Sequence, residues 1–98
     1  MTKRETIRRL TRNRGKLAAF RVRHLSLFGS TARDEARETS DVDLLVEFEP
    51  GVPVGLFTFV ALQRFLGDVL GSRIDLATPA ALRPEMREQI LTEAVRVL

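Results

Sequence analysis

The stretch that decides the fold runs from residue 24 to residue 48 and reads HLSLFGSTARDEARETSDVDLLVEF. Residues 24–28 alternate apolar and polar side chains with the period of a β-strand, which ends at Gly29-Ser30. The pattern then predicts a short helix over 31–37. A second strand is predicted over 42–48, and its centre is apolar enough to be covered on both faces.

Helices are predicted on both sides of this stretch. One opens the chain, where Thr2 and Glu5 have the capping-box spacing, and Gly15 is expected to bend or fray it. Its expected buried face is Ile7, Leu10, Leu17 and Ala18. Another amphipathic helix ends before Gly71, with core positions at Leu56, Phe57, Val60, Phe65, Leu66, Val69 and Leu70.

The rest of the chain completes an alternating order of elements. A short strand is predicted over 73–77, and a last helix begins near Pro84, which the first turn of a helix tolerates. The expected buried face of that helix is Met86, Ile90, Leu91, Ala94 and Leu98. The order α-β-α-β-α-β-α predicts the α/β (α+β) class, with helices packed on a small sheet. The length of 98 residues predicts a single domain, residues 1–98.

The composition excludes several kinds of site and location. Without cysteine, the chain has no disulfide framework, no thiolate nucleophile and no cysteine-based zinc site. The longest uncharged stretch, residues 50–63, is too short to span a membrane, and no apolar signal core follows the basic N-terminus. We therefore expect a cytoplasmic protein that has no membrane partner.

The net charge of +3 is distributed unevenly. Residues 1–24 hold nine Lys and Arg side chains and one acid, whereas the rest of the chain is net negative. A basic opening segment is typical of proteins that bind phosphate groups or nucleic acid, but a solvated helix face has the same composition. Direct binding to nucleic acid is therefore left open.

Three aspartates are candidate metal ligands. Asp41 and Asp43 are two residues apart, so an extended strand presents both carboxylates on one face, where a cation would offset their repulsion. Mg²⁺ suits such oxygen ligands, although acids at the end of a strand can also simply be solvated. Asp75 is an isolated acid in the next predicted strand. If the two strands are neighbours, three carboxylates converge and could hold two ions for phosphoryl or nucleotidyl transfer.

Gly29 and Ser30 stand where a strand turns into a helix. Glycine permits close approach of the backbone to a ligand, and the exposed N–H groups of a helix N-terminus favour phosphate. An ordinary helix cap uses the same residues. The one histidine, His24, has no nucleophile at a recognisable triad spacing, so we expect it to be structural or solvent-facing.

These motifs resemble a known family. Residues 27–33, residues 40–46 and residues 70–76 together look like the signature of the DNA polymerase β-like nucleotidyltransferase superfamily. The resemblance is greatest to its smallest members, the minimal nucleotidyltransferases, and covers about residues 20–98. It implies the polymerase β-like nucleotidyltransferase fold, a small mixed sheet with flanking helices.

The resemblance also implies roles for individual residues. By position it assigns nucleotide binding to Gly29, Ser30 and Arg33, and catalytic and metal-binding roles to Asp41, Asp43 and Asp75. It implies ATP as the substrate and Mg²⁺ as the cofactor, with one or two ions. Arg33 is expected either to reach a phosphate or to form a salt bridge with Asp34, Glu38 or Asp41. Many members have glycine at the position of Asp34, which brings negative charge nearer the triphosphate.

A partner protein is implied as well. Minimal nucleotidyltransferases are typically encoded beside a HEPN protein, and such pairs act as toxin–antitoxin systems. The transferase, a protein adenylyltransferase, moves AMP from ATP onto a tyrosine of the HEPN RNase toxin and so acts as its antitoxin. Two alternatives are nucleotidyl transfer to a small-molecule hydroxyl and a non-catalytic antitoxin that acts by binding its partner. The sequence leaves open whether the chain forms a homo-oligomer or a hetero-oligomer.

Overall fold

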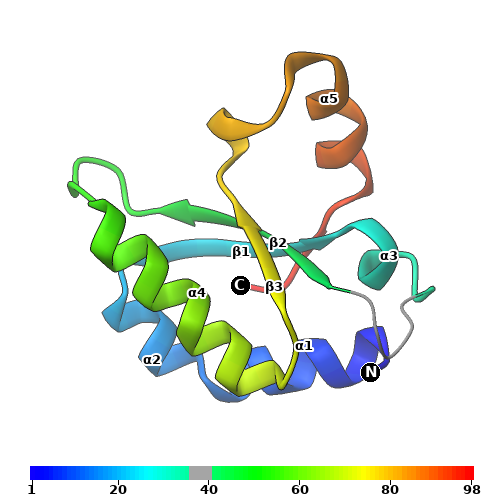
Figure 1. Cartoon of the computed structure of the whole chain (residues 1–98), viewed down its shortest axis with the longest axis horizontal. Coiled ribbons are helices and arrows are strands. Elements are labelled where there is room, and N and C mark those ends of the chain that lie inside the picture. The colour runs from blue at the N-terminus through cyan, green and yellow to red at the C-terminus, as the bar shows by residue number, and fades with distance from the viewer. Residues whose placement is uncertain (36–40) are drawn as a thin grey trace.

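A four-stranded sheet forms the centre of the computed structural model, which describes residues 1–35 and 41–98 (Figure 1). Its strands are β1 (Val22–Phe28), β2 (Val42–Phe48), β3 (Ile74–Ala77) and β4 (Val95–Arg96). Their spatial order is β3-β2-β1-β4. Strand β1 is antiparallel to β2 and to β4, whereas β2 and β3 are parallel, which confirms the expected small mixed sheet.

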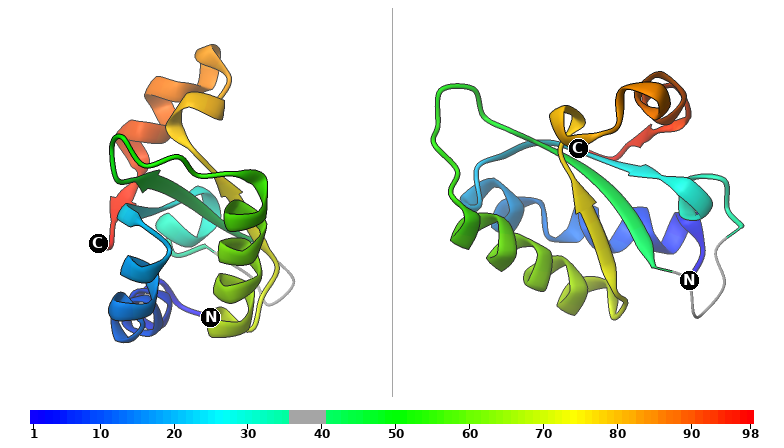
Figure 2. Two further views of the ribbon diagram at one scale, coloured as in Figure 1. Left: turned by 90° about the vertical axis from the view of Figure 1, so that its left-hand side faces the viewer. Right: turned by 45° about the horizontal axis from the view of Figure 1, so that its top comes forward.

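Three helices cover one face of this sheet, as Figure 2 shows: α1 (Lys3–Arg12), α2 (Arg14–Ala19) and α4 (Leu56–Leu70). Their buried leucines pack against buried side chains of β1 and β2 to form the core. A short 3₁₀ turn, η1 (Pro79–Ala81), and α5 (Pro84–Glu93) lie toward the other face, which we call the open face. On this face of β2, Leu45 is buried, Asp43 is half-buried and Glu47 is exposed, so the prediction of a strand covered on both faces is confirmed at the centre of the strand and not at its end.

The opening helix follows the prediction only in part. The Thr2 hydroxyl accepts a hydrogen bond from the backbone N–H of Glu5 at 3.1 Å, which is the expected cap. The Glu5 carboxylate pairs with Arg8 and Arg9. The helix breaks at Asn13 and not at Gly15, because the Asn13 side chain donates to the backbone oxygen of Arg9 at 2.8 Å.

Helix α4 has the predicted bounds, and Gly71 ends it in the left-handed conformation with φ of 63°. The predicted core role of its first residues is wrong, because Phe57 is 92% exposed and Leu56 and Val60 are also exposed. The buried stripe is Leu62, Leu66 and Leu70. A 15-residue helix is about 22 Å long and the four-residue strand β3 only about 13 Å, so the start of α4 extends past the strand that it covers.

The C-terminal prediction is also corrected. Helix α5 begins at Pro84 as expected, but it ends at Glu93, and the chain then continues as strand β4. The predicted buried face is wrong, since no residue of α5 is buried and Leu91 is 45% exposed. The physical reason lies in β1, whose free edge accepts the chain: the Val97 N–H donates to the backbone oxygen of Leu25 at 2.8 Å.

Strand β1 leads directly into α3 (Gly29–Ala32), which begins two residues earlier than the predicted helix over 31–37. The last two residues of that prediction, and Ser40 of the motif, lie outside the described residues. Within the part of the chain that the structure describes, every helix is too short or too polar to cross a membrane.

Candidate functional site

The parallel pairing of β2 and β3 sets two of the predicted carboxylates side by side. Asp43 of β2 is in direct register with Asp75 of β3, and on its other side Asp43 pairs with Phe28 at the end of β1. Asp43 is half-buried and Asp75 is exposed. The condition for convergence, that the two strands are neighbours, is therefore met for this pair, and the pair stands beside the Gly29-Ser30 turn.

The third predicted carboxylate stands slightly apart. Asp41 directly precedes β2 and is exposed, and one of its oxygens, Oδ1, lies 4.0 Å from Nε of Arg73. Across residues 1–35 and 41–98, no three Asp, Glu or His side chains are gathered closely enough to form a ready-made metal site. The structure thus brings Asp43 and Asp75 together and leaves Asp41 at their side next to a guanidinium group.

The electrostatics of Asp43 are unusual for an aspartate. Burial first, then the charges of Asp75 and Asp41 and a hydrogen bond with Asp75, raise the pKa of the Asp43 carboxyl from 3.8 to about 6, while Arg33 opposes the rise. A bound cation would favour the charged form and offset the repulsion. The donor set, carboxylate oxygens open to solvent on one side, has the chemistry that Mg²⁺ prefers. The predicted metal therefore fits the residues present.

Gly29 is required by the packing of Asp43. It has φ of 67°, a conformation that favours glycine, and a Cβ atom at this position would overlap Oδ2 of Asp43 and stand 3.1 Å from its Cγ. The half-buried Ser30 follows as the second residue of α3. Next to it, the Thr31 hydroxyl is buried and has no hydrogen-bond partner among the described residues. Sequence reasoning missed Thr31, although its place directly after the Gly-Ser pair was a signal.

Arg33 forms different ion pairs from those predicted. Within the described ranges its guanidinium contacts Glu35 at 3.2 Å and Glu93 of α5 at 3.5 Å, and neither Asp34 nor Asp41. The predicted partner Glu38 lies outside the described residues. The Glu93 contact ties α3 to α5 across 60 residues of sequence, so no local pattern could have indicated it.

The Asp34 carboxylate has a backbone partner at the start of α1. The φ of 56° at Asp34 is left-handed, a conformation that favours glycine and in which Asp, with its short polar side chain, is tolerated. Its Oδ1 accepts a hydrogen bond from the backbone N–H of Lys3 at 3.0 Å. The carboxylate therefore satisfies an N–H group at the start of α1, where the helix dipole also stabilises negative charge.

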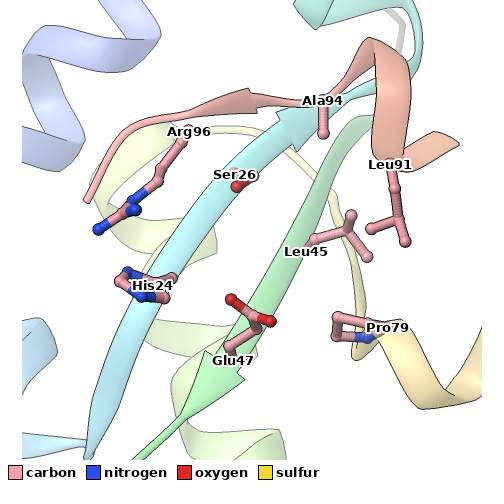
Figure 3. A pocket seen from close by; sticks show the side chains of 8 residues that line it. All are labelled: His24, Ser26, Leu45, Glu47, Pro79, Leu91, Ala94 and Arg96. Carbon is pink, nitrogen blue, oxygen red and sulfur yellow. The ribbon is translucent and has the colours of Figure 1, made fainter.

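A pocket of about 190 Å³ lies farther along the open face (Figure 3). His24, which we expected to be structural or solvent-facing, is half-buried and lines it together with Glu47 and Arg96. The Nδ1 atom of His24 also lies 3.2 Å from the backbone oxygen of Leu98. The alternation along β1 and β2 was a signal for two of these residues, whereas Arg96 comes from the strand that the sequence did not predict.

Comparisons with known proteins cover most of this chain. The nucleotidyltransferase domain family matches residues 5–97. The chain is 46% identical over 77 residues to MJ0435 of Methanocaldococcus jannaschii, a protein named as a protein adenylyltransferase. The match covers 79% of this chain and 81% of that one. It is 42% identical over 78 residues to the protein adenylyltransferase MntA of Thermococcus cleftensis, covering 80% and 77%.

Solved structures have the same fold. One, described as a minimal nucleotidyltransferase, is 38% identical with a TM-score of 0.81, covering 97% of this chain and 95% of that chain. A toxin–antitoxin complex with AMP-PNP matches at 20% identity and a TM-score of 0.67, covering 88% and 73%. A tri-AMPylated Shewanella oneidensis HEPN toxin in complex with its MNT antitoxin matches at 18% identity and a TM-score of 0.58, covering 90% and 71%. These last two show the fold alone.

Proposed function

The chain belongs to the nucleotidyltransferase domain family, and we propose that it is a Mg²⁺-dependent protein adenylyltransferase that acts as an antitoxin. Its substrate is ATP, and its acceptor is a tyrosine hydroxyl of a HEPN-type RNase toxin. The observation that carries the proposal is the direct register of Asp43 with Asp75, next to the Gly29 turn. The relatives named protein adenylyltransferase support the reaction, and the HEPN toxin complex of a protein with this fold supports the partner.

The phosphates of ATP are held at the end of β1. The turn at Gly29 presents backbone N–H groups, and the Ser30 hydroxyl adds a donor for the β- and γ-phosphates. Arg33 lies one turn further along the chain and supplies positive charge once a phosphate displaces one of its exposed carboxylate partners. These residues orient the triphosphate and hold the leaving pyrophosphate.

The carboxylates hold the metal and direct the acceptor. Asp43 and Asp41, with Asp75, are the residues that would bind Mg²⁺. When bound, Mg²⁺ neutralises the clustered carboxylates and withdraws electron density from the α-phosphate. Asp75 is the exposed member of the register pair, so it accepts a hydrogen bond from the incoming hydroxyl and orients it.

The reaction balances as a substitution at phosphorus. The acceptor oxygen forms a bond to the α-phosphorus, and the bond between that phosphorus and the oxygen that bridges it to the β-phosphate breaks. The hydroxyl proton passes to the Asp75 carboxylate, and pyrophosphate leaves with the electron pair of the broken bond. The product is an AMP–tyrosine phosphodiester on the toxin.

The test uses the chain together with a HEPN toxin, ATP labelled at the α-phosphate, and Mg²⁺. We expect label on a toxin tyrosine, loss of the RNase activity of the toxin, and loss of labelling by at least about a hundredfold in Asp43→Asn. Asp68→Asn makes the same chemical change at an exposed site on α4 and serves as the matched control. Labelling that survives replacement of both Asp41 and Asp43 by Ala contradicts the mechanism. Neutralisation that persists in that variant without labelling favours the non-catalytic antitoxin.

A further inference from the structure

The pocket on the open face has a distinct composition at each end (Figure 3). Leu45, Pro79, Leu91 and Ala94 form an apolar side, and the polar groups come from His24, Ser26, Glu47 and Arg96. Its volume of about 190 Å³ is below the range of about 300–1,000 Å³ that is typical of sites for whole drug-sized ligands. The pocket therefore suits one flat ring system, not an entire nucleotide.

The pocket lies on the same face of the sheet as the proposed catalytic site. Asp43, Leu45 and Glu47 are successive residues on one face of β2, and opposite them on β1 stand Phe28, Ser26 and His24. Two residues of a strand span about 6.7 Å. The pocket thus begins one such step from the Asp43 carboxylate, at the distance where the part of a nucleotide beyond its α-phosphate would lie.

The direction of the reaction favours the nucleoside as the occupant. The leaving pyrophosphate lies near Ser30, at the end of β1, and the acceptor hydroxyl lies near Asp75 on β3. The line from the acceptor oxygen through the α-phosphorus to the leaving oxygen therefore runs across the strands. The nucleoside is a further substituent of the α-phosphorus, so it must point away from this line. Running along β1 and β2, it reaches the pocket beneath α5.

Glu47 and Arg96 determine which hydrogen-bonding edge of a ring the pocket can bind. Glu47, as a carboxylate, only accepts hydrogen bonds, whereas the Arg96 guanidinium only donates. The Nε of Arg96 already donates to the backbone oxygen of Leu98 at 3.0 Å, which fixes the side chain and leaves its terminal nitrogens for a ligand. A base with an amino group beside a ring nitrogen satisfies both residues, and adenine has this edge.

We propose that this pocket holds the nucleobase of the substrate and that Glu47, with Arg96, selects adenine over bases that lack its amino group. The proposal rests on the proposed function, because it takes a nucleotide to be the substrate. Hypoxanthine carries an oxygen in place of the adenine amino group, so ITP places that oxygen against the Glu47 carboxylate. Discrimination between ATP and ITP is therefore the property that Glu47 controls.

The experiment measures the binding of ATP, ITP and inorganic tripolyphosphate by calorimetry in Mg²⁺ for the wild type, Glu47→Gln and Glu49→Gln. Glu49 is exposed and outside the pocket, so its variant removes the same charge as a matched control. A lost charged hydrogen bond corresponds to about a tenfold or larger change, so the wild type should prefer ATP by at least that factor. Glu47→Gln should reduce the preference for ATP over ITP to within about threefold, mainly by weakening the binding of ATP. Glu49→Gln should leave the preference for ATP over ITP unchanged.

A second variant tests the pocket without relying on Glu47. Leu91→Trp on the exposed surface of α5 places a large ring in the pocket, and should weaken ATP and ITP together while tripolyphosphate binds as before. An unchanged ATP-to-ITP ratio in Glu47→Gln overturns the proposal, as does an effect confined to the affinity for the toxin, which would make the pocket an acceptor site. Failure of the wild type to bind any of the three ligands would instead contradict the proposed function.

Discussion

The carboxylate of Asp43 occupies the space that a side chain at Gly29 would need. A Cβ atom at residue 29 would overlap Oδ2 of Asp43 and lie 3.1 Å from Cγ, and the backbone there has φ of 67°. The two motif residues are thus packed against each other. The turn that is proposed to hold phosphate and the carboxylate that is proposed to hold metal form one rigid contact, so a change in either should disturb both.

Gly29→Ala should abolish transfer and weaken Mg²⁺ binding, because the new methyl group displaces the Asp43 carboxylate. The left-handed backbone costs a non-glycine residue about 1–2 kcal/mol, and each kcal/mol lowers Tm by about 4–8 °C in a domain of this size. Gly71→Ala is the matched control, since its φ is 63° and nothing lies within 4 Å of its added Cβ. Thermal melts should show destabilisation in both variants, whereas transfer assays should show lost activity only in Gly29→Ala. Normal activity in Gly29→Ala would show that the contact is not needed.

Asp43→Asn should stabilise the metal-free protein at neutral pH. The folded-state pKa of about 6 lies above the ordinary 3.8, so the folded state keeps a proton that the unfolded chain releases between these values. The stability contributed by this group is full below about pH 4 and is lost as the pH rises to about 6. The variant should therefore gain about 1 kcal/mol above pH 6.5, with solvent screening allowed for, and almost nothing at pH 4.

The measurement is the difference in Tm between Asp43→Asn and the wild type at several pH values in a metal chelator. Taking the difference removes the contribution of groups common to both proteins. Asp68→Asn, which makes the same chemical change at an exposed position on α4, is the matched control. A stabilisation by Asp43→Asn that grows as the pH falls toward 4 would contradict the raised pKa of Asp43 as its cause.

Mg²⁺ should raise the Tm of the wild type, and by more at pH 7.5 than at pH 5. The metal binds the deprotonated carboxylate, so protons compete with it below the pKa of about 6. A ligand at a hundred times its Kd stabilises by about 2.7 kcal/mol, which sets the scale of the largest shift. Chelation should reverse the effect, and Asp43→Asn should remove most of it. An equal response at both pH values would place the binding of Mg²⁺ elsewhere.

Glu93→Gln should strengthen the binding of tripolyphosphate. In the structure the Glu93 carboxylate lies 3.5 Å from the Arg33 guanidinium and competes with a phosphate for it. Exposed ion pairs contribute about 0–1 kcal/mol, so affinity should rise by up to about fivefold while Tm changes little. Glu88→Gln on the same helix is the control, and calorimetry is the measurement. Weaker binding in Glu93→Gln would mean that the contact positions Arg33 and does not compete for it.

The elements that were predicted correctly are those with local causes. Strand β2 has the predicted bounds because Asp41 precedes it and a Pro-Gly turn follows it closely, and α4 ends where Gly71 permits a left-handed residue. The final residues illustrate the opposite case. Val95 to Leu98 continue a helical pattern in the sequence, yet Val95 and Arg96 pair with β1, because a free strand edge nearby satisfies their backbone groups.

For the candidate site as well, some features were visible in the sequence and others depended on tertiary structure. Residue types and spacing were enough to single out Asp41, Asp43, Asp75 and the Gly29-Ser30 pair, because carboxylates in an apolar strand and glycine before a helix are visible in one dimension. Tertiary structure alone decided that Asp43 lies beside Asp75, that Asp41 faces Arg73, and that His24, Glu47 and Arg96 share a pocket. Each of these relationships depends on strand register between distant parts of the chain, and hydrophobic periodicity identifies a strand without saying which residue of another strand it will face.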